Sequence, residues 1–568
     1  MAYDLLIKNG RIIDGSGMPA FRGDVAVQHG KIVEMGKLRG SATRTIDADG
    51  LVVAPGFVDN HCHYDAQVTW DPLCSFSCYH GATTVIIGNC SLSLAPVKPG
   101  AQERLAEFLS YVEAIPMEVL RTVEFSWESM SEYMNTLDQR LGLNVGTLLG
   151  HSALRYYVMG DECQGRAATS NEIQAMRRVV HDAIQAGALG LSVSRNKGHY
   201  DPQGVHIPAI WAEEDELFAL GDVLSELGTG VIQSGGGRAA ELRNRLMSRL
   251  SEATGRQVVY NNLGQSVREP NAWKELMAIV DETASAGIRA YPLCTPNSTT
   301  QRFTMRNSQV FRGVPTWHPI LLASDDDKLR AYSDPGIRQK LHQEVVDWTV
   351  DIPGATLSRQ WYDYIWVEEP ALAKNKALQG KSLRELAEAQ GKRIIDAFLD
   401  LVVEENLDTV FLQGELNVDK AAVTKILNYP NAIVGLSDGG AHVQFHGGYG
   451  YSTRLLGHWV RDEGIMSLEQ AVRRLTFESA TVFGIFDRGL LRPGMAADIT
   501  LFNPDTVGPL PEDAVHDFPA GGWRMREMAA GVHYTIVNGQ VLIEDGKHTG
   551  ALPGRVMRNS LYQTHTAM

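Results

Sequence analysis

The chain has 568 residues, a formal net charge of −15 at pH 7, 44% hydrophobic residues and 21% charged residues. This length predicts one large domain plus a smaller one, and the composition is typical of a globular protein. The acidic balance, with no basic block, argues against nucleic acid or an anionic membrane as partner, so we expect a small-molecule substrate. No apolar run reaches the roughly 20 residues that span a bilayer, and the N-terminus is typical of a strand rather than of a signal peptide.

The cysteines are too few and too irregularly spaced for a disulfide framework. We therefore expect reduced thiols in a cytoplasmic protein. The oligomeric state stays open, and a homo-oligomer is compatible with the sequence. The six cysteines are Cys62, Cys74, Cys78, Cys90, Cys163 and Cys294.

Both ends of the chain alternate apolar and polar residues between glycine turns, as short strands joined by tight turns do. The pattern covers residues 24–33 near the N-terminus and returns at residues 534–543 near the C-terminus. Because the same pattern occurs at both ends, we expect one small β-sandwich domain built from residues 1–52 and 490–568. The central chain, residues 53–489, is then an insert in that domain.

The central chain alternates apolar strands with helices, which is typical of a parallel sheet buried on both faces. Eight such units fit a TIM-like (β/α)8 barrel, so the expected fold class is α/β. The gap before the last strand is far longer than an ordinary connection, which predicts an insertion at about residues 295–425. The expected strands are residues 51–58, 82–88, 143–150, 188–194, 229–234, 256–261, 288–293 and 432–437.

Two histidines one residue apart, His61 and His63, follow the apolar run at residues 51–57. Alternate side chains of an extended segment point to the same side, so both imidazoles can face one divalent metal ion. Barrel active sites lie at the C-terminal ends of the strands, where this pair falls. Cys62 lies between the histidines and is expected to point away and pack. The alternative is two unrelated surface histidines at a strand end.

Two more candidate ligands follow the ends of the second and eighth expected strands. Cys90 is a strong zinc ligand as a thiolate, although buried reduced cysteines are also common. Asp438 can bind a metal and can also take a proton from water, because a bound metal brings the pKa of that water toward neutrality. Alone, this aspartate beside glycines indicates only a helix cap or a turn.

Together with their flanking segments, these residues resemble the amidohydrolase superfamily, and within it the D-aminoacylase branch of N-acyl-D-amino-acid deacylases. The resemblance runs nearly end to end and implies the same barrel fold and a metal-dependent hydrolase. His61, His63, Cys90 and Asp438 match the metal residues of this family, in which the cysteine bridges two metal positions. The matching segments include Pro55–Asp59, Gly88–Cys90, Gly150–Arg155, Ser437–Gly439 and Leu491–Asp498.

The second metal position of the family needs one histidine at the end of strand five and another at the end of strand six. Gln233 or Ser234 stands at the first of these places and Asn262 at the second. Neutral amides and hydroxyls bind Zn²⁺ weakly compared with imidazole. We therefore expect one Zn²⁺ per chain, with iron, manganese or another divalent metal as alternatives. A further alternative is that His199 or His442 takes the missing place.

The cations with which the family binds a substrate carboxylate are also missing, since residues 263–265 and 445–450 contain no lysine or arginine. A carboxylate without cationic partners is poorly compensated in a partly dry pocket. The second stretch is aromatic and glycine-rich, so we expect a neutral or aromatic N-acyl substrate. A charge supplied by Arg155, Arg195 or Arg302 would overturn this expectation. The residues expected to contact the substrate are His151, Arg155, His199, Tyr200, Asn262 and Tyr449.

The sequence thus predicts a metal-dependent hydrolase of a non-peptide carbon–nitrogen bond, with Asp438 as the catalytic acid–base residue. Deamination, opening of a cyclic amide or ester, and a lyase step are the alternatives on the same scaffold. The alternative from a different class is a binding protein that kept the fold without catalysis, which the missing histidines on strands five and six favour. Four convergent ligands argue against that alternative.

Overall fold

The computed structural model describes residues 2–236, 245–350 and 357–562. The chain divides into two compact units, which are described separately below. The larger unit contains residues 1–263, 274–297 and 424–568, and the smaller one contains residues 264–273 and 298–423.

Strands from both ends of the chain form one nine-stranded sheet in the larger unit. The two ends meet where β17 runs antiparallel to β5, with Ile499 opposite Pro55. The core of this sheet includes Leu5, Val25 and Ile536, all nearly inaccessible to solvent. The strands are β1 (Tyr3–Ile12), β2 (Phe21–Gln28), β3 (Lys31–Gly36), β4 (Ala42–Asp47), β5 (Val52–Pro55), β17 (Ile499–Phe502), β22 (Val532–Val537), β23 (Gln540–Glu544) and β24 (Lys547–His548).

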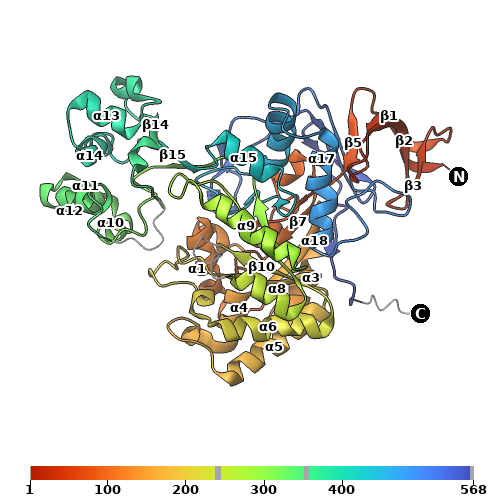
Figure 1. Cartoon of the computed structure of the whole chain (residues 1–568), viewed down its shortest axis with the longest axis horizontal. Coiled ribbons are helices and arrows are strands. Elements are labelled where there is room, and N and C mark those ends of the chain that lie inside the picture. Colours follow the sequence, from red (N-terminus) through yellow and green to blue (C-terminus); the bar gives the residue numbers. More distant parts are fainter. Residues whose placement is uncertain (1, 237–244, 351–356, 563–568) are drawn as a thin grey trace. The chain divides into compact units, whose positions relative to one another are not determined.

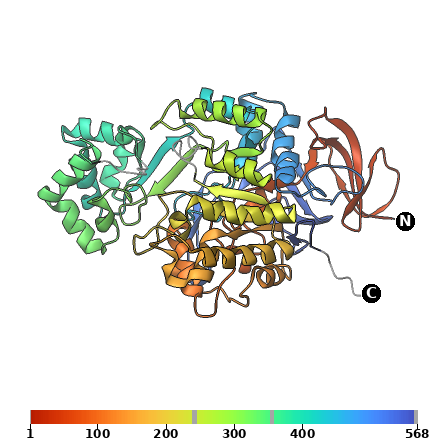
Figure 2. The ribbon, with the colours of Figure 1, turned by 60° about the horizontal axis from the view of Figure 1, so that its bottom comes forward.

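Eight parallel strands form the barrel, so the predicted α/β barrel fold is confirmed. Apolar side chains from successive strands fill its interior, among them Val58, Val231 and Val259. Helices α5 (Ser170–Gln185) and α6 (Glu214–Leu227) are among those that lie outside the strands (Figure 1). Figure 2 shows the same helices from a second direction. The strands are β6 (Phe57–Asp59), β7 (Ala82–Ile87), β8 (Asn144–Gly150), β9 (Gly190–Ser194), β10 (Val231–Gly235), β11 (Gln257–Tyr260), β12 (Ala290–Cys294) and β16 (Ile433–Val434).

The first expected strand, residues 51–58, is two strands that belong to different sheets. β5 joins the terminal sheet, whereas β6 begins the barrel, and Gly56 lies between them. A Cβ atom at Gly56 would lie 2.1 Å from Oγ1 of Thr83, so the chain passes too close for any side chain. The Gly56 N–H donates to the carbonyl of Asp498 at 2.9 Å, which fixes the crossing from one sheet to the other.

The barrel closes through the segments that follow its first and last strands. The N–H of His63 donates to the carbonyl of Gly439 at 2.7 Å, and the N–H of Asp438 donates to the carbonyl of His61 at 3.1 Å. Cys62 and Gly439 form a parallel bridge at the same point. Closure of the barrel therefore brings the His-x-His pair beside Asp438.

The smaller unit has a three-stranded sheet and a hydrophobic core of its own. Phe311 and Trp317 stack in that core with ring centroids 4.0 Å apart. In the described residues of the whole chain, no helix is long and apolar enough to cross a membrane. The elements of this unit include β13 (Thr299–Phe303), β14 (Ile365–Glu369), β15 (Val410–Leu416), α11 (Asp325–Ser333), α12 (Pro335–Val345) and α14 (Ile394–Glu404).

Candidate metal centre

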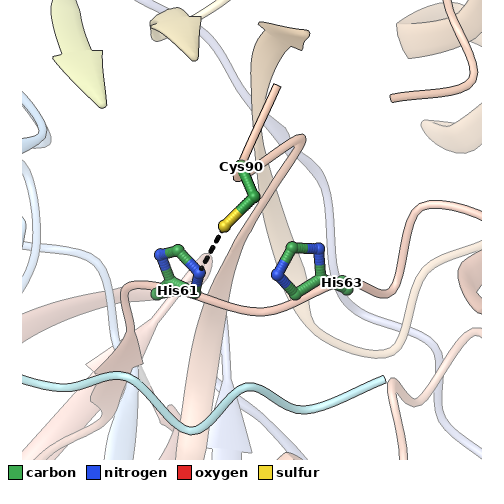
Figure 3. A group of neighbouring side chains, drawn as sticks. All are labelled: His61, His63 and Cys90. Carbon is green, nitrogen blue, oxygen red and sulfur yellow. Dashed lines mark hydrogen bonds between the residues drawn. The ribbon is translucent and has the colours of Figure 1, made fainter. Parts of the chain in front are cut away.

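His61, His63 and Cys90 converge at the C-terminal ends of the first two barrel strands (Figure 3). One potential ligand atom from each residue lies within 4.8 Å of the other two. The cysteine sulfur is 3.5 Å from Nε2 of His61. All three side chains are buried, so they face one another rather than solvent.

The turn after β7 directs Cys90 toward the histidines. Asn89 donates from Nδ2 to the carbonyls of Cys62 and Ile86, at 3.0 and 2.8 Å. Cys62 turns away as expected, and its Sγ donates to the same Ile86 carbonyl at 3.0 Å. A Cβ atom at Gly235 would lie 2.7 Å from the Cys90 sulfur, so a glycine there leaves room for the thiol.

Asp438 approaches both imidazoles from the segment after β16. Its Oδ1 lies 3.6 Å from Nε2 of His61 and 3.4 Å from Nε2 of His63. The carboxylate is outside the set of three mutually close ligands, so the imidazoles lie between the thiol and the carboxylate. Asp438 has a left-handed backbone with φ of 56°, and its side chain is 29% exposed, whereas the histidines are almost fully buried.

The spacing of neighbouring donors in this group is that found around a zinc ion, although the carboxylate lies outside the close set of three. A tetrahedral zinc ion with normal bond lengths places its ligand atoms roughly 3.3–3.7 Å apart. The separations of 3.5 Å from thiol to imidazole and of 3.6 and 3.4 Å from carboxylate to imidazole lie in this range. Two imidazoles, a thiol and a carboxylate are also the donor types that Zn²⁺ prefers.

The electrostatics of the site separate the two histidines. Burial, assisted by His63, lowers the pKa of His61 to about 3, so this ring is neutral with a lone pair available. Burial opposes the charged form of His63, but Glu113, Asp438 and Cys90 raise its pKa well above the usual value. Enclosure likewise opposes ionisation of Asp438, but its contacts with His63, His442 and His61 lower its pKa below the usual range.

Two amide side chains face the ligands from strands five and six. Gln233 accepts the Cys90 N–H at Oε1, at 3.0 Å, and its Nε2 lies 3.3 Å from Oδ1 of Asn261. Nδ2 of Asn261 lies 3.2 Å from Nε2 of His61 and 3.8 Å from the Cys90 sulfur. The amide beside the ligands is therefore Asn261, one residue before the expected Asn262.

The pleat of the two strands explains this choice. Val231 and Val259 point into the barrel interior, where they belong to one apolar cluster. Side chains two residues apart share a face of a strand, so Gln233 and Asn261 continue the inward face at the strand ends. The same rule directs Ser234 away from the ligands.

Glu113 is a neighbour of the ligands that sequence reasoning missed. It ends helix α1 (Gln102–Glu113), is 2% exposed, and places Oε1 at 3.4 Å from Nδ1 of His63. Burial, reinforced by Asp438, raises the pKa of Glu113 to about 7, against the opposing charge of His63. The sequence feature that could have indicated this residue is its spacing: Glu113 lies four residues after Leu109, so both share the buried apolar face of the helix.

His442, named above as a substitute ligand, also lies close to this group. Its Nε2 is 3.9 Å from Oδ2 of Asp438 and 4.0 Å from Oε2 of Glu113. Its side chain is 29% exposed, so it lies on the solvent side of the centre. These distances place His442 beside the carboxylates rather than beside the thiol.

His151 and Arg155 lie on helix α4 (His151–Met159), directly after β8, and both are fully buried. Nε2 of His151 is 2.7 Å from one carboxylate oxygen of Glu216, and Arg155 pairs with the other oxygen. Arg155 also donates to the carbonyl of Arg166 at 2.9 Å. Glu216 thus engages both side chains, and their contact with substrate stays a prediction.

The remaining predicted substrate residues lie in two loops and beside Asn261. In the loop after β9, Nε2 of His199 is 2.8 Å from Nδ2 of Asn196. In the same loop, the ring of Tyr200 stacks on that of His206, with centroids 4.4 Å apart. Tyr449 is 1% exposed in the loop after β16, and Asn262 is partly buried. Their roles in substrate binding stay predictions.

Comparison with known proteins agrees with the fold. Residues 44–543 match the model of the Amidohydrolase family. The D-aminoacylase of Alcaligenes xylosoxydans xylosoxydans is 29% identical over 566 residues, covering 98% of this chain and 97% of that protein. The N-acyl-D-glutamate deacylase of the same organism is 28% identical over 562 residues, covering 98% and 96%.

Two similar solved structures carry metal information. One is a D-aminoacylase with a binuclear metal centre, described by one-metal activation and second-metal attenuation. The other is an N-acyl-D-glutamate deacylase from Bordetella bronchiseptica in complex with zinc and a phosphonate mimic of the tetrahedral intermediate. Each has a TM-score of 0.67 and 26% identity, and the match covers 98% of this chain and 100% of the solved chain. This chain therefore belongs to the amidohydrolase family of enzymes, which hydrolyse carbon–nitrogen bonds other than peptide bonds.

Proposed function

We propose that the chain hydrolyses a secondary amide with one divalent metal ion, zinc by preference, held by His61, His63, Cys90 and Asp438. The observation that carries this proposal is the spacing of thiol, imidazoles and carboxylate, 3.4–3.6 Å between neighbouring donor atoms. The zinc complex of the Bordetella bronchiseptica deacylase supports the choice of metal. A bound ion of this kind supplies polarisation of a carbonyl group and a lower pKa for water.

Asp438 is the proposed acid–base residue. Its lowered pKa keeps it a carboxylate at neutral pH, so Oδ1 or Oδ2 can take the proton of the attacking water. The protonated carboxyl group can then donate that proton to the nitrogen of the leaving amine. The 29% exposure of its side chain leaves it accessible to both reactants.

A single metal is proposed because the inward positions on strands five and six carry amides. Gln233 and Asn261 occupy the places beside Cys90 where a second ion would need imidazoles. Their hydrogen bonds with the Cys90 amide and with each other orient the cysteine. The related D-aminoacylase is described with one-metal activation, which supports catalysis by one ion.

A neutral or aromatic N-acyl substrate is proposed from the charges of the centre. A divalent ion is offset by the Cys90 thiolate and by the carboxylates of Asp438 and Glu113, so no positive charge remains for a substrate carboxylate. Arg155 is committed to Glu216, and Arg195 donates to the carbonyl of Ala212 at 2.8 Å. Within the smaller unit, Arg302 pairs with Glu368 at 2.6 Å.

A substrate panel tests this proposal. Purified protein with its metal is offered N-acyl-D-amino acids beside neutral N-acyl anilides, and kcat/KM is measured for each. We expect the neutral anilides to be preferred and the products to be an acid and an organic amine. Preference for the N-acyl-D-amino acids would overturn the substrate class, and ammonia as the product would indicate a deaminase instead.

We also propose that the protein is cytoplasmic and acts on a small molecule, with no nucleic-acid partner. All six cysteines lie in the described part of the chain, and each is buried and free of disulfide bonds. Reduced cysteines are typical of a reducing compartment.

A further inference from the structure

Helix α1 ends with a carboxylate at a place that is unfavourable for one. Glu113 lies on the same face as Leu109 and Leu105, four and eight residues earlier, and is as buried as they are. Burial of a carboxylate is costly unless the charge is compensated. A negative charge at the C-terminal end of a helix is also disfavoured by the helix dipole. A glutamate at this position is therefore expected only if a partner offsets the free energy of burying its charge and its unfavourable interaction with the helix dipole.

The partner that the structure gives Glu113 is a proposed metal ligand. Oε1 of Glu113 lies 3.4 Å from Nδ1 of His63, and Nε2 on the far side of the same ring lies 3.4 Å from Oδ1 of Asp438. The ring thus has Glu113 on one side and the centre on the other.

The second carboxylate oxygen of Glu113 faces the loop that carries Asp438. Oε2 lies 4.0 Å from Nε2 of His442, and the same Nε2 lies 3.9 Å from Oδ2 of Asp438. The end of the helix is itself held in place, because Ser110 donates to the carbonyl of Ile115 at 2.6 Å. Glu113 is therefore fixed between the first-strand ligand and the eighth-strand loop.

We propose that Glu113 is a positioning residue, which accepts the Nδ1 proton of His63 and so keeps Nε2 of that ring directed at the metal position. This inference rests on the proposed metal site. A carboxylate on the outer nitrogen of a ligand histidine fixes the tautomer and the orientation of the ring and strengthens it as a ligand. Helix α1, outside the barrel strands, thereby contributes to the affinity for the metal.

Metal affinity tests the proposal without depending on turnover. The full-length wild type and the variants Glu113→Ala and Glu113→Gln are stripped of metal and titrated with Zn²⁺ in competition with a chelating dye. We expect Glu113→Ala to bind Zn²⁺ about 10–100-fold more weakly, as loss of an orienting partner does. Glu113→Gln is expected to lose less, because its Oε1 still accepts the Nδ1 proton.

Glu103→Gln is the matched control on the same helix. Glu103 is exposed and pairs with Arg121 at 2.7 Å rather than with a ligand, so the affinity of the Glu103→Gln variant for Zn²⁺ should equal that of the wild type. A Glu113→Ala variant that folds and binds Zn²⁺ as tightly as the wild type would overturn the proposal. If the alanine variant does not fold, Glu113→Leu, which fills the buried position but has no acceptor, takes its place, and unchanged affinity for Zn²⁺ in that variant overturns the proposal. A wild type that binds no Zn²⁺ would overturn the metal site itself, which is a different outcome.

Discussion

The two sides of the centre are built from different chemistry on the same barrel. The ligand side, His61, His63, Cys90 and Asp438, comes from strands one, two and eight and carries titratable donors. The amide side, Gln233 and Asn261, comes from strands five and six and carries neutral carboxamides. Both sides contact Cys90. On the ligand side, His61 lies beside the Cys90 sulfur. On the amide side, Asn261 lies beside the same sulfur and Gln233 accepts the Cys90 backbone N–H.

The two sides therefore have different roles: the ligand side binds the metal, and the amide side orients the ligands. Imidazole, thiolate and carboxylate bind Zn²⁺ directly, whereas carboxamides orient a neighbouring ligand by hydrogen bonding. The ligand side should therefore determine whether a metal binds and whether turnover occurs. The amide side should change the affinity for the metal by a smaller factor.

The largest expected effect is on turnover after replacement of the carboxylate of the ligand side. In Asp438→Asn the base is lost while the two imidazoles and the thiol remain, so kcat should fall about 10²–10⁴-fold. Metal content, measured by elemental analysis, should stay close to that of the wild type. Turnover within tenfold of the wild type would show that another group removes the proton.

The affinity for metal should depend steeply on pH because of the ligand side. Burial raises the pKa of Cys90 to about 11, and the pKa of His63 is raised well above its usual value, so both hold a proton at neutral pH before the metal binds. Metal binding releases these protons, so affinity should rise by about two log units per pH unit and fall equally as pH drops. Competition titrations with Zn²⁺ from pH 8 to 9, above the pKa of about 7 of the neighbouring Glu113, measure this slope.

Cys90→Ser and Asn261→Ala distinguish the two sides in the same titrations. The serine variant lacks the thiol proton, so its slope should fall to about one log unit per pH unit. Asn261 does not titrate, so Asn261→Ala should keep the slope of the wild type. Equal slopes in the wild type and Cys90→Ser would mean that the thiol is not a ligand.

The amide side should have a moderate effect of its own. Gln233→Ala removes the acceptor of the Cys90 N–H, and we expect metal affinity to fall by about tenfold, the lower part of the range for an orienting partner. The number of metal ions per chain should not change, as elemental analysis can check. Complete loss of metal in this variant would make Gln233 a ligand in its own right.

The smallest effect on activity is expected at the buried pair near β8. Arg155→Met leaves Glu216 without its arginine, and removal of one partner of a buried ion pair costs about 3–5 kcal/mol of unfolding free energy. We expect this loss in chemical denaturation, with KM within about twofold of the wild type at a temperature where the variant is folded. A large rise in KM instead would support the sequence-based assignment of Arg155 to the substrate.

Local patterns predicted the strands and the convergence of the candidate ligands His61, His63 and Cys90 for identifiable reasons. Strands buried on both faces, such as β7 and β8, are visible as short segments rich in apolar and β-branched residues without charges, and Cys90 follows closely after β7. The break at Gly56 was missed because it depends on the approach of Thr83 from another strand. Asn261 could have been chosen over Asn262 by counting alternate residues from the apolar positions of the strand.

Glu113 is the residue that local patterns could least predict. Its spacing from Leu109 marks it as buried, but nothing in the spacing indicates that the end of α1 reaches His63. That contact joins two elements 50 residues apart and exists only after the barrel has closed. The same holds for the contacts of Asp438, which form where the first and last strands meet.

The number of tightly bound metal ions per chain decides whether the centre holds one ion or two. Wild-type protein and the double variant Gln233→His/Asn261→His are saturated with Zn²⁺, freed of excess metal and analysed for zinc. We predict about one tightly bound ion in the wild type and a second in the double variant, whose imidazoles would replace the amides beside the Cys90 sulfur. Two tightly bound ions in the wild type would contradict a single-metal centre and show that Gln233 and Asn261 do not prevent binding of a second ion.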